Sequence, residues 1–418
     1  MKYLLSIALL SAALLAAGQT LPTGKPAENG LSADRLNRID QIVKEHVDNK
    51  YVNGAVVMVL RNGKIVYHKA IGYSDVEKQT AMKKDDIFRI ASQTKAITSL
   101  GVMMLFEEGK FLLDDPISRY LPEFKSPKVL GTVNWADTSY TTIPAKGEIT
   151  IRQLLTHTSG IDYAAIGSQE FKAIYAKAGV PSGIGSANMV LADRMKILGG
   201  LPLKHQPGEA FTYGLNTDVL GYLIEVISGM SLDQFFRTRI FQPLGMNDTY
   251  FYLPAEKHAR LVPLYQVTGG KLSKVSTGVY DKTNVNYPAL PGTYYSGGAG
   301  LSSTTEDYAR FLQLFLNKGE LNGVRLLGRK TVELMLTNQT QPPITEQFGL
   351  GFGLETDKND YRSIYSEGTF TWGGAFSSTY WADPKEKLVG LIYTNLTISP
   401  YRNMNEKLKT AIYQSIVD

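Results

Sequence analysis

The feature that most constrains the fold is the position of the two clearest β-hairpin signals, which lie at opposite ends of the chain. Near the N-terminus, residues 55–71 are rich in β-branched and aliphatic residues and contain Asn62-Gly63, a dipeptide typical of tight hairpin turns. Near the C-terminus, residues 373–394 repeat this pattern around a turn at Pro384. Because neither hairpin can bury a large core alone, the pattern predicts one antiparallel sheet built from both ends of the chain.

Helices are expected next to each hairpin. Ser32 is a good N-cap for a first helix, and Asn405 begins an amphipathic segment at the other end. A further helix is expected to run from Ser92 towards Gly109. Apolar spacing of the helical kind also recurs at 151–156, 187–198, 217–228, 231–240, 303–317 and 328–337.

The middle of the chain is therefore expected to be mainly helical. Its Gly-, Pro- and Asn-rich stretches at 125–149 and 253–295 are expected to be long loops, which often border functional sites. The fold class that follows is α/β of the α+β type, with two domains. Residues 30–100 and 295–418 form the α/β sheet domain, and residues 101–294 form the helical domain inserted between them.

The first 18 residues have the pattern of a signal peptide. Lys2 is followed by the apolar run 3–17, and Ala16, Ala17 and Gly18 supply the small residues of a cleavage site. No later stretch is long and apolar enough to predict a membrane anchor. We therefore expect a periplasmic or secreted protein.

Composition excludes several classes of function. The 44 basic and 39 acidic residues give a formal charge of only +5, too small for a polybasic nucleic-acid binder. The absence of cysteine excludes disulfides, thiolate metal sites and a cysteine nucleophile. The five histidines show no metal-ligand spacing, so neither a metal nor a cofactor is expected. His157 is expected to be a buried structural residue, and Gly297–Gly300 lacks the strand–helix context of a dinucleotide fingerprint.

The segment Ser92-Gln93-Thr94-Lys95 is the candidate for chemistry. A serine at the start of a helix sits where the macrodipole favours a developing negative charge. Lys95 lies three residues further on, so its amine shares a helix face with the Ser92 hydroxyl and can accept its proton. A serine and a lysine at this spacing also occur by chance, so the segment alone is a weak signal.

Longer strings around this segment resemble a known group of enzymes. They are Phe88–Ala91, Gly109–Pro116, Tyr120–Pro122, Ile149–Gly160 and Pro207–Tyr213. Their order is similar to that of the penicillin-recognising serine hydrolases, which include class C β-lactamases, DD-peptidases and family VIII carboxylesterases. The resemblance covers residues 32–418, is closest to the family VIII esterases, and implies the two-domain β-lactamase-like fold.

The resemblance also implies roles for individual residues. Ser92 and Lys95 match the family's S-x-x-K motif, and Tyr213 matches its second motif. Ser92 is then the nucleophile, and the Lys95–Tyr213 pair takes its proton, with the formal base left open between the two. The backbone amides of Ser92 and Ala375 would form the oxyanion hole.

Two departures from the family motifs bear on the substrate. Trp372-Gly373-Gly374 stands where β-lactamases and DD-peptidases carry K-T-G, so the cation and hydroxyl that hold a carboxylate are missing. Leu215 replaces the second motif's Asn, which contacts an amide side chain in those enzymes. With these four residues lining the substrate site, uncharged acyl groups should be favoured.

The function predicted from the sequence is a serine hydrolase that cleaves short-chain carboxylic esters through an acyl-enzyme on Ser92. Its substrate would be a small-molecule ester or amide. The alternatives are a β-lactamase or D-Ala-D-Ala carboxypeptidase, a transacylase, and a catalytically silent penicillin-binding-like sensor.

Overall fold

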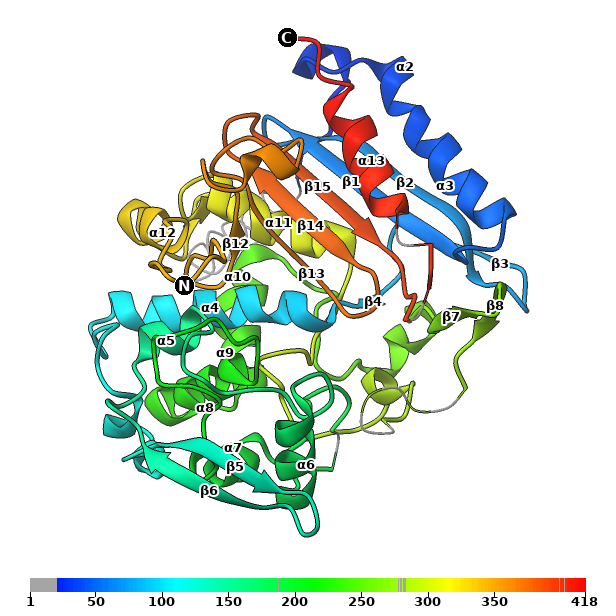
Figure 1. Ribbon diagram of the computed structural model, residues 1–418. Coiled ribbons are helices and arrows are strands. Elements are labelled where there is room, and N and C mark those ends of the chain that lie inside the picture. The colour runs from blue at the N-terminus through cyan, green and yellow to red at the C-terminus, as the bar shows by residue number, and fades with distance from the viewer. Residues whose placement is uncertain are drawn as a thin grey trace, which may run out of the picture.

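The computed structural model of this chain describes residues 21–418 apart from positions 187, 277, 279, 281, 282, 398 and 402. The predicted signal peptide, residues 1–18, lies outside the described residues. One half of the molecule is a seven-stranded antiparallel sheet in the order β12-β13-β14-β15-β1-β2-β3 (Figure 1). These strands are β1 (Gly54–Arg61), β2 (Lys64–Asp75), β3 (Thr80–Ala81), β12 (Gly353–Leu354), β13 (Phe370–Gly373), β14 (Thr379–Asp383) and β15 (Leu388–Tyr393).

The centre of the sheet joins the two ends of the chain. Strand β1 pairs with β15 in an antiparallel register that runs from Val56 opposite Tyr393 to Arg61 opposite Leu388. On its other side, β1 pairs with β2 across the turn at residues 62–63. The prediction of an antiparallel sheet built from both termini is confirmed.

Strand β1 is buried along its whole length because both faces of the sheet are covered. Val56 and Met58 face a large core that also contains residues of the central helices, whereas Val57 and Val59 face a second core. This alternation follows from the two-residue repeat of a strand. Each fully buried side chain of this kind stabilises the fold by about 1.5–3 kcal/mol.

Three helices cover the face of the second core: α2 (Ala33–Leu36), α3 (Arg38–Asp48) and α13 (Met404–Tyr413). Figure 1 shows α3 and α13 side by side on this face, with α11 beyond the opposite face. Ser32 caps α2 by accepting a hydrogen bond from the backbone amide of Arg35, as its position in the sequence predicts.

Helices surround the large core on the other side. They are α4 (Thr94–Glu107), α5 (Ile151–Leu155), α6 (Gln169–Ala178), α7 (Leu191–Gly199), α8 (Asn216–Ser228), α9 (Leu232–Phe236), α10 (Gln242–Leu244), α11 (Thr305–Leu316) and α12 (Arg329–Met335). Helix α4 is buried on nearly all sides, and it packs against α8. The sequence did not predict α6. The domain boundaries expected from the sequence stay a prediction.

Two expected loops contain β-hairpins, so the prediction of loops at 125–149 and 253–295 is wrong in part. The first hairpin consists of β5 (Lys128–Asn134) and β6 (Ser139–Pro144), and the second of β7 (Tyr265–Thr268) and β8 (Lys271–Lys274). Strands β5 and β6 are largely exposed, so their sequence lacks the alternation of apolar and polar residues that marks a half-buried strand. The remaining short strands are β4 (Phe88–Arg89), β9 (Ser302–Ser303), β10 (Glu320–Leu321) and β11 (Val324–Arg325).

Among the described residues, no single helix is long and apolar enough to cross a membrane. Two consecutive helical segments, Asn216–Ser228 and Leu232–Leu244, are long and apolar enough only when taken together. They are bent by 80° at the break between them.

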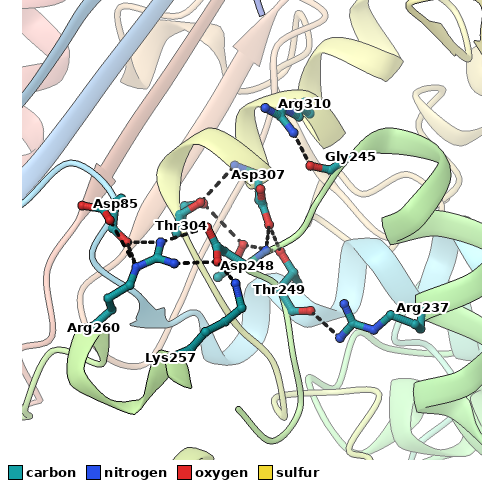
Figure 2. A network of polar contacts seen from close by, with 11 residues as sticks. Asp85, Arg237, Gly245, Asp248, Thr249, Lys257, Arg260, Thr304, Asp307 and Arg310 are labelled. Carbon is teal, nitrogen blue, oxygen red and sulfur yellow. Dashed lines mark hydrogen bonds and ion pairs between the residues drawn. The ribbon is translucent and has the colours of Figure 1, made fainter. Parts of the chain in front are cut away.

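A network of ion pairs and hydrogen bonds anchors the segment that leads to Ser92 (Figure 2). Both carboxylate oxygens of Asp248 accept hydrogen bonds from Arg260, at 2.7 and 2.8 Å. The backbone amide of Asp248 donates to Asp307 at the start of α11, at 2.7 Å. The backbone carbonyl of Arg260 accepts from the amide of Ile87 at 2.8 Å, one residue before β4. The network therefore fixes β4 against the rest of the fold, three residues ahead of Ser92.

Candidate active site

Ser92 lies in a 3-10 turn, Ala91–Gln93, immediately before α4. The sequence analysis placed it at the first residue of the helix, and this detail is wrong. Ala91 has φ of +43°, a left-handed conformation that costs a non-glycine residue about 1–3 kcal/mol. Two buried phenols hold the turn, because Tyr308 donates to the carbonyl of Gln93 at 2.8 Å and Tyr393 to its side-chain oxygen at 2.7 Å.

Lys95 is buried on α4, and its amine has three oxygen partners. The Nζ atom lies 2.8 Å from the hydroxyl of Tyr163, 2.8 Å from the carbonyl of Gly298 and 3.5 Å from Ser92 Oγ. The Ser92 contact is the longest of the three, as catalytic hydrogen bonds often are in a free enzyme. The amine is therefore placed to receive the proton of Ser92 once that contact shortens.

Tyr163 is the site residue that the sequence analysis missed. It is buried and lies in the loop after α5. Its backbone amide donates a hydrogen bond to Asp162 Oδ1 at 2.8 Å. Burial raises the pKa of Tyr163 well above its usual range, and the nearby Tyr213 phenol and its hydrogen bond raise it further. The phenol of Tyr163 therefore stays protonated and orients the amine of Lys95. No spacing rule in the sequence connects these residues, since 68 positions separate Tyr163 from Lys95.

Tyr213 lies beside Lys95 and Tyr163 and borders the cavity in front of Ser92. Its ring lies beneath the Lys95 ammonium, with Nζ 4.5 Å from the ring centroid. The Tyr163 ring is 5.4 Å away and the Trp372 ring 5.5 Å away, measured between centroids. Tyr213 thus lies between the buried amine and Tyr163 on one side and the cavity in front of Ser92 on the other.

Residues 373–375 bring the backbone amide of Ala375 to the site, where it would complement the amide of Ser92 in an oxyanion hole. Gly373 ends β13, Gly374 and Ala375 follow it, and all three border the same cavity as Ser92. A Cβ on Gly374 would lie 2.4 Å from the carbonyl oxygen of Ile90, so only glycine permits this approach. In the part of the chain that the structure describes, the amide N–H of Ala375 has no hydrogen-bond acceptor. It is therefore free to donate to an oxyanion beside Ser92.

Two other residues expected to bind substrate lie behind the site. The side chain of Leu215 is fully buried in the large core, at the N-terminal end of α8, and does not border the cavity. Its expected contact with substrate is therefore corrected to a packing role, because the register of α8 turns it inward. The Trp372 ring packs against Tyr213 and Phe348, 5.3 Å from the latter, and supports the Tyr213 ring.

His157 is buried, as expected for a structural residue. Its Nδ1 accepts a hydrogen bond from the Asn216 amide at 2.9 Å, and its ring packs 5.0 Å from that of Tyr213. Burial, together with the charge of Lys95, lowers the pKa of His157 well below its usual range. The imidazole is therefore neutral, and it holds Tyr213 in place by packing.

The cavity in front of Ser92 has a volume of about 450 Å³. Hydroxyl and amide groups line it beyond the reaction centre, including those of Ser378, Thr379 and Asn405. A second space of about 40 Å³ also borders Ser92, and Ile166 and other apolar residues line it. Among the described residues that line either space, none is Lys, Arg, Asp or Glu.

The described residues also contain no group of three or more His, Asp or Glu side chains placed to hold a metal ion.

Comparisons with known proteins agree with this geometry. A family model described as Beta-lactamase matches residues 39–414. Protein Rv1367c of Mycobacterium tuberculosis is 34% identical over 366 residues, which cover 84% of this chain and 87% of that protein. Esterase EstB of Burkholderia gladioli is 30% identical over 400 residues, which cover 92% of this chain and 96% of EstB.

A solved structure shows the same fold. The structure of EstCE1, described as a hydrolase with promiscuous acyltransferase activity, has a TM-score of 0.78 and is 26% identical in sequence. The match covers 91% of this chain and 99% of EstCE1.

Proposed function

The chain belongs to the beta-lactamase family and is a serine hydrolase, and from that premise we propose that it cleaves short-chain, uncharged carboxylic esters. The observation that carries this proposal is the contact of Ser92 with the buried amine of Lys95, at the edge of a cavity whose described lining residues include no Lys, Arg, Asp or Glu. A nucleophile, a proton acceptor and space for a neutral substrate therefore meet at one point.

In the proposed acylation step, Ser92 Oγ attacks the ester carbonyl carbon and transfers its proton to the amine of Lys95. A new Oγ–C bond forms, and the carbonyl becomes an oxyanion facing the amides of Ser92 and Ala375. When the carbonyl re-forms, the bond to the alcohol breaks, and the proton passes to the alkoxide through the Tyr163–Tyr213 phenols. In deacylation, a water molecule attacks the acyl carbonyl carbon and gives its proton to the same phenols and the amine of Lys95. The bond between the acyl group and Ser92 Oγ then breaks, and Oγ takes the proton back as the acid leaves.

The two spaces beside Ser92 support the proposed substrate range. A volume of about 40 Å³ admits only a few non-hydrogen atoms, which suits a short acyl chain. The larger space borders Tyr213, the group nearest to the departing alcohol, and suits a bulkier alcohol part. A β-lactam or peptide carboxylate would find no cation among the described lining residues, so its desolvation would remain uncompensated.

A substrate panel tests the proposal. It would compare p-nitrophenyl acetate, butyrate and octanoate with a chromogenic cephalosporin and a D-Ala-D-Ala peptide, with the Ser92→Ala variant as the blank. We expect kcat/KM to be highest for the acetate or butyrate and well below that for the cephalosporin and the peptide. A β-lactam as the best substrate of the panel would overturn the esterase assignment.

A second candidate function is acyl transfer to an alcohol. The cavity of about 450 Å³ is far larger than a single attacking water needs, so an acceptor alcohol can occupy it beside the acyl-enzyme. EstCE1, which has this fold, is described as having promiscuous acyltransferase activity. Product analysis with p-nitrophenyl butyrate and added 1-butanol would separate the two outcomes. Butyl butyrate in excess of butyrate would favour transfer, and butyrate alone would favour hydrolysis.

We also propose export from the cytoplasm, on the basis of the pattern in residues 1–18. Mass spectrometry of the protein recovered from the periplasm or medium of its host should find the N-terminus between about Gly18 and Leu21. An intact Met1 on that material would contradict the proposal.

A further inference from the structure

Asp218 is a buried acid that the mechanism above does not use. It lies in the first turn of α8, is completely shielded from solvent, and has Oδ1 2.7 Å from the hydroxyl of Ser296, which donates to it. Burial raises the pKa of Asp218 to about 6, although the charge of Lys95 counteracts this rise. The carboxylate is therefore mostly ionised at neutral pH, and a buried charge of this kind is costly unless it is compensated.

Part of this compensation comes from the glycine-rich loop 296–300, whose Ser296 hydroxyl donates to Oδ1, whereas Oδ2 has no hydrogen-bond partner among the described residues. The same loop contacts the catalytic helix α4. The carbonyl of Gly298 accepts a hydrogen bond from Lys95 Nζ at 2.8 Å, and that of Gly297 accepts from Thr98 Oγ1 at 2.7 Å. The backbone of the loop folds back on Ser296, whose hydroxyl accepts from the amide of Ala299 at 3.0 Å. One side of the loop thus holds Lys95, and the other side is held by Asp218.

The glycines allow this contact. A Cβ on Gly298 would lie 2.4 Å from Asp218 Oδ2, and a Cβ on Gly297 would lie 2.4 Å from the carbonyl oxygen of Thr217. Any side chain at either position would push the loop away from α8 and move the Gly298 carbonyl away from Lys95. The run Gly297–Gly300, which matches no dinucleotide fingerprint, is explained by this close packing.

We propose that Asp218 is a positioning residue for Lys95: it fixes the loop whose Gly298 carbonyl orients the amine, and its negative charge stabilises the ammonium formed when Ser92 loses its proton. The groups that face Asp218 are Lys95 from α4, the Tyr163 phenol from the loop after α5, and the Tyr294 phenol from the segment before Ser296. Both phenols stay protonated because burial raises their pKa values well above the usual range. Asp218 therefore supplies the negative charge of this cluster, and Lys95 becomes its positive partner when it takes the proton of Ser92.

This inference rests on the proposed function, because it concerns the proton transfer from Ser92. The test compares Asp218→Asn, which keeps the shape and removes the charge, with Glu225→Gln as a matched control. Glu225 lies on the same helix but does not border either space beside Ser92. Its Oε1 accepts a hydrogen bond from the backbone amide of Leu232 at 2.9 Å. Steady-state kinetics with p-nitrophenyl acetate between pH 5 and 9, together with thermal melts, give the readouts.

We expect Asp218→Asn to lower kcat about 10- to 100-fold, the range expected from losing a charge-assisted contact. KM should change less than threefold, because the carboxylate does not border the cavity. Because the pKa of Asp218 is raised to about 6, we expect the wild-type kcat/KM to fall below about this pH. This acidic limb should be lost in Asp218→Asn and retained in Glu225→Gln. A merely structural role would lower Tm without moving this limb.

A second variant keeps the inference testable if Asp218→Asn fails to fold. Ser296→Ala removes only the hydroxyl that joins the loop to Asp218, and a smaller loss of kcat, about 3- to 10-fold, is expected. Folded variants with wild-type kcat and an unchanged pH profile would overturn the inference. If Ser92→Ala stayed active, the proposed function itself would be refuted, and this inference with it. If Ser92→Ala were inactive and Asp218→Asn normal, only this inference would fail.

Discussion

The structure makes a sharp prediction about the two tyrosines beside Lys95, because their geometries differ. Tyr163 contacts the amine through its hydroxyl, at 2.8 Å, whereas Tyr213 contacts it through its ring face, 4.5 Å from the centroid. Replacing Tyr163 by Phe therefore removes one of the two short contacts of a buried amine. Replacing Tyr213 by Phe leaves the contact between the ring and the Lys95 amine intact and removes only the hydroxyl of a residue that borders the cavity.

The magnitudes follow from these contacts. A hydrogen bond to a charged group contributes about 1.5–3 kcal/mol, which corresponds to about a 10- to 150-fold loss of kcat/KM for Tyr163→Phe. Loss of a general acid or base costs about 10²- to 10⁴-fold, so Tyr213→Phe should be the more damaging change. Because both phenols serve one proton path, the double variant should be little worse than Tyr213→Phe alone.

Stopped-flow kinetics with p-nitrophenyl acetate would measure the acylation burst directly. Tyr175→Phe is the matched control, since Tyr175 is also fully buried and its hydroxyl accepts a hydrogen bond from the backbone amide of Asp162, at 3.3 Å, with no other hydrogen-bond partner among the described residues. This control should keep the wild-type burst rate within about twofold, and thermal melts would confirm that all variants fold. A large loss for Tyr163→Phe beside a nearly normal Tyr213→Phe would refute the assignment, because the proton would then not pass through the Tyr213 hydroxyl.

Three further predictions follow from single contacts. Ser92→Ala should reduce esterase activity to background and abolish the acyl adduct seen by intact mass spectrometry; an adduct on another serine would disprove the mechanism. Gly374→Ala, whose Cβ would lie 2.4 Å from a backbone carbonyl, should displace the Ala375 amide and lower kcat about 10²- to 10³-fold. Gly147→Ala, which meets no atom within 4 Å, should leave the rate unchanged, and equal rates for both variants would argue against this oxyanion hole. Burial raises the pKa of Asp307 to about 7, so the folded state binds a proton that the unfolded state has released between about pH 4 and 7. Folding stability should therefore fall as pH rises through this window, and urea denaturation of Asp307→Asn should show a flatter pH dependence; an unchanged slope would refute the role of Asp307.

The parts of the fold that the sequence predicts are those with strong local signals. Strand β1 and its turn at Asn62-Gly63 combine a valine-rich apolar run with a specific turn dipeptide, and β15 is also largely apolar. The hairpins β5–β6 and β7–β8 lack such a signal. Strand β5 keeps only Val129 buried, so its pairing is visible only in three dimensions.

The candidate site likewise contains contacts that local sequence predicts and contacts that only the folded chain creates. Ser92 and Lys95 are three residues apart on one turn, so their proximity follows from helix geometry. Tyr163 reaches Lys95 across 68 positions and Gly298 across 203, and no local pattern predicts such contacts. The Gly298 contact is made by a backbone carbonyl, which leaves no residue type to recognise. Leu215 occupies the motif position where related enzymes carry a substrate-contacting Asn, but at the start of α8 its side chain is buried in the core.

The contacts of Lys95 explain why a site this small needs the whole fold. The amine is carried by α4, and its partners come from the turn before α4, the loop after α5 and the loop 296–300. That last loop is held by Asp218 on α8, and the oxyanion amide of Ala375 arrives from the sheet. A charge on Lys95 is tolerable in this buried place only while all these groups are aligned, since an unpaired buried charge is far more costly than a paired one. Substitutions that loosen any one of these segments should therefore impair proton transfer before they unfold the protein.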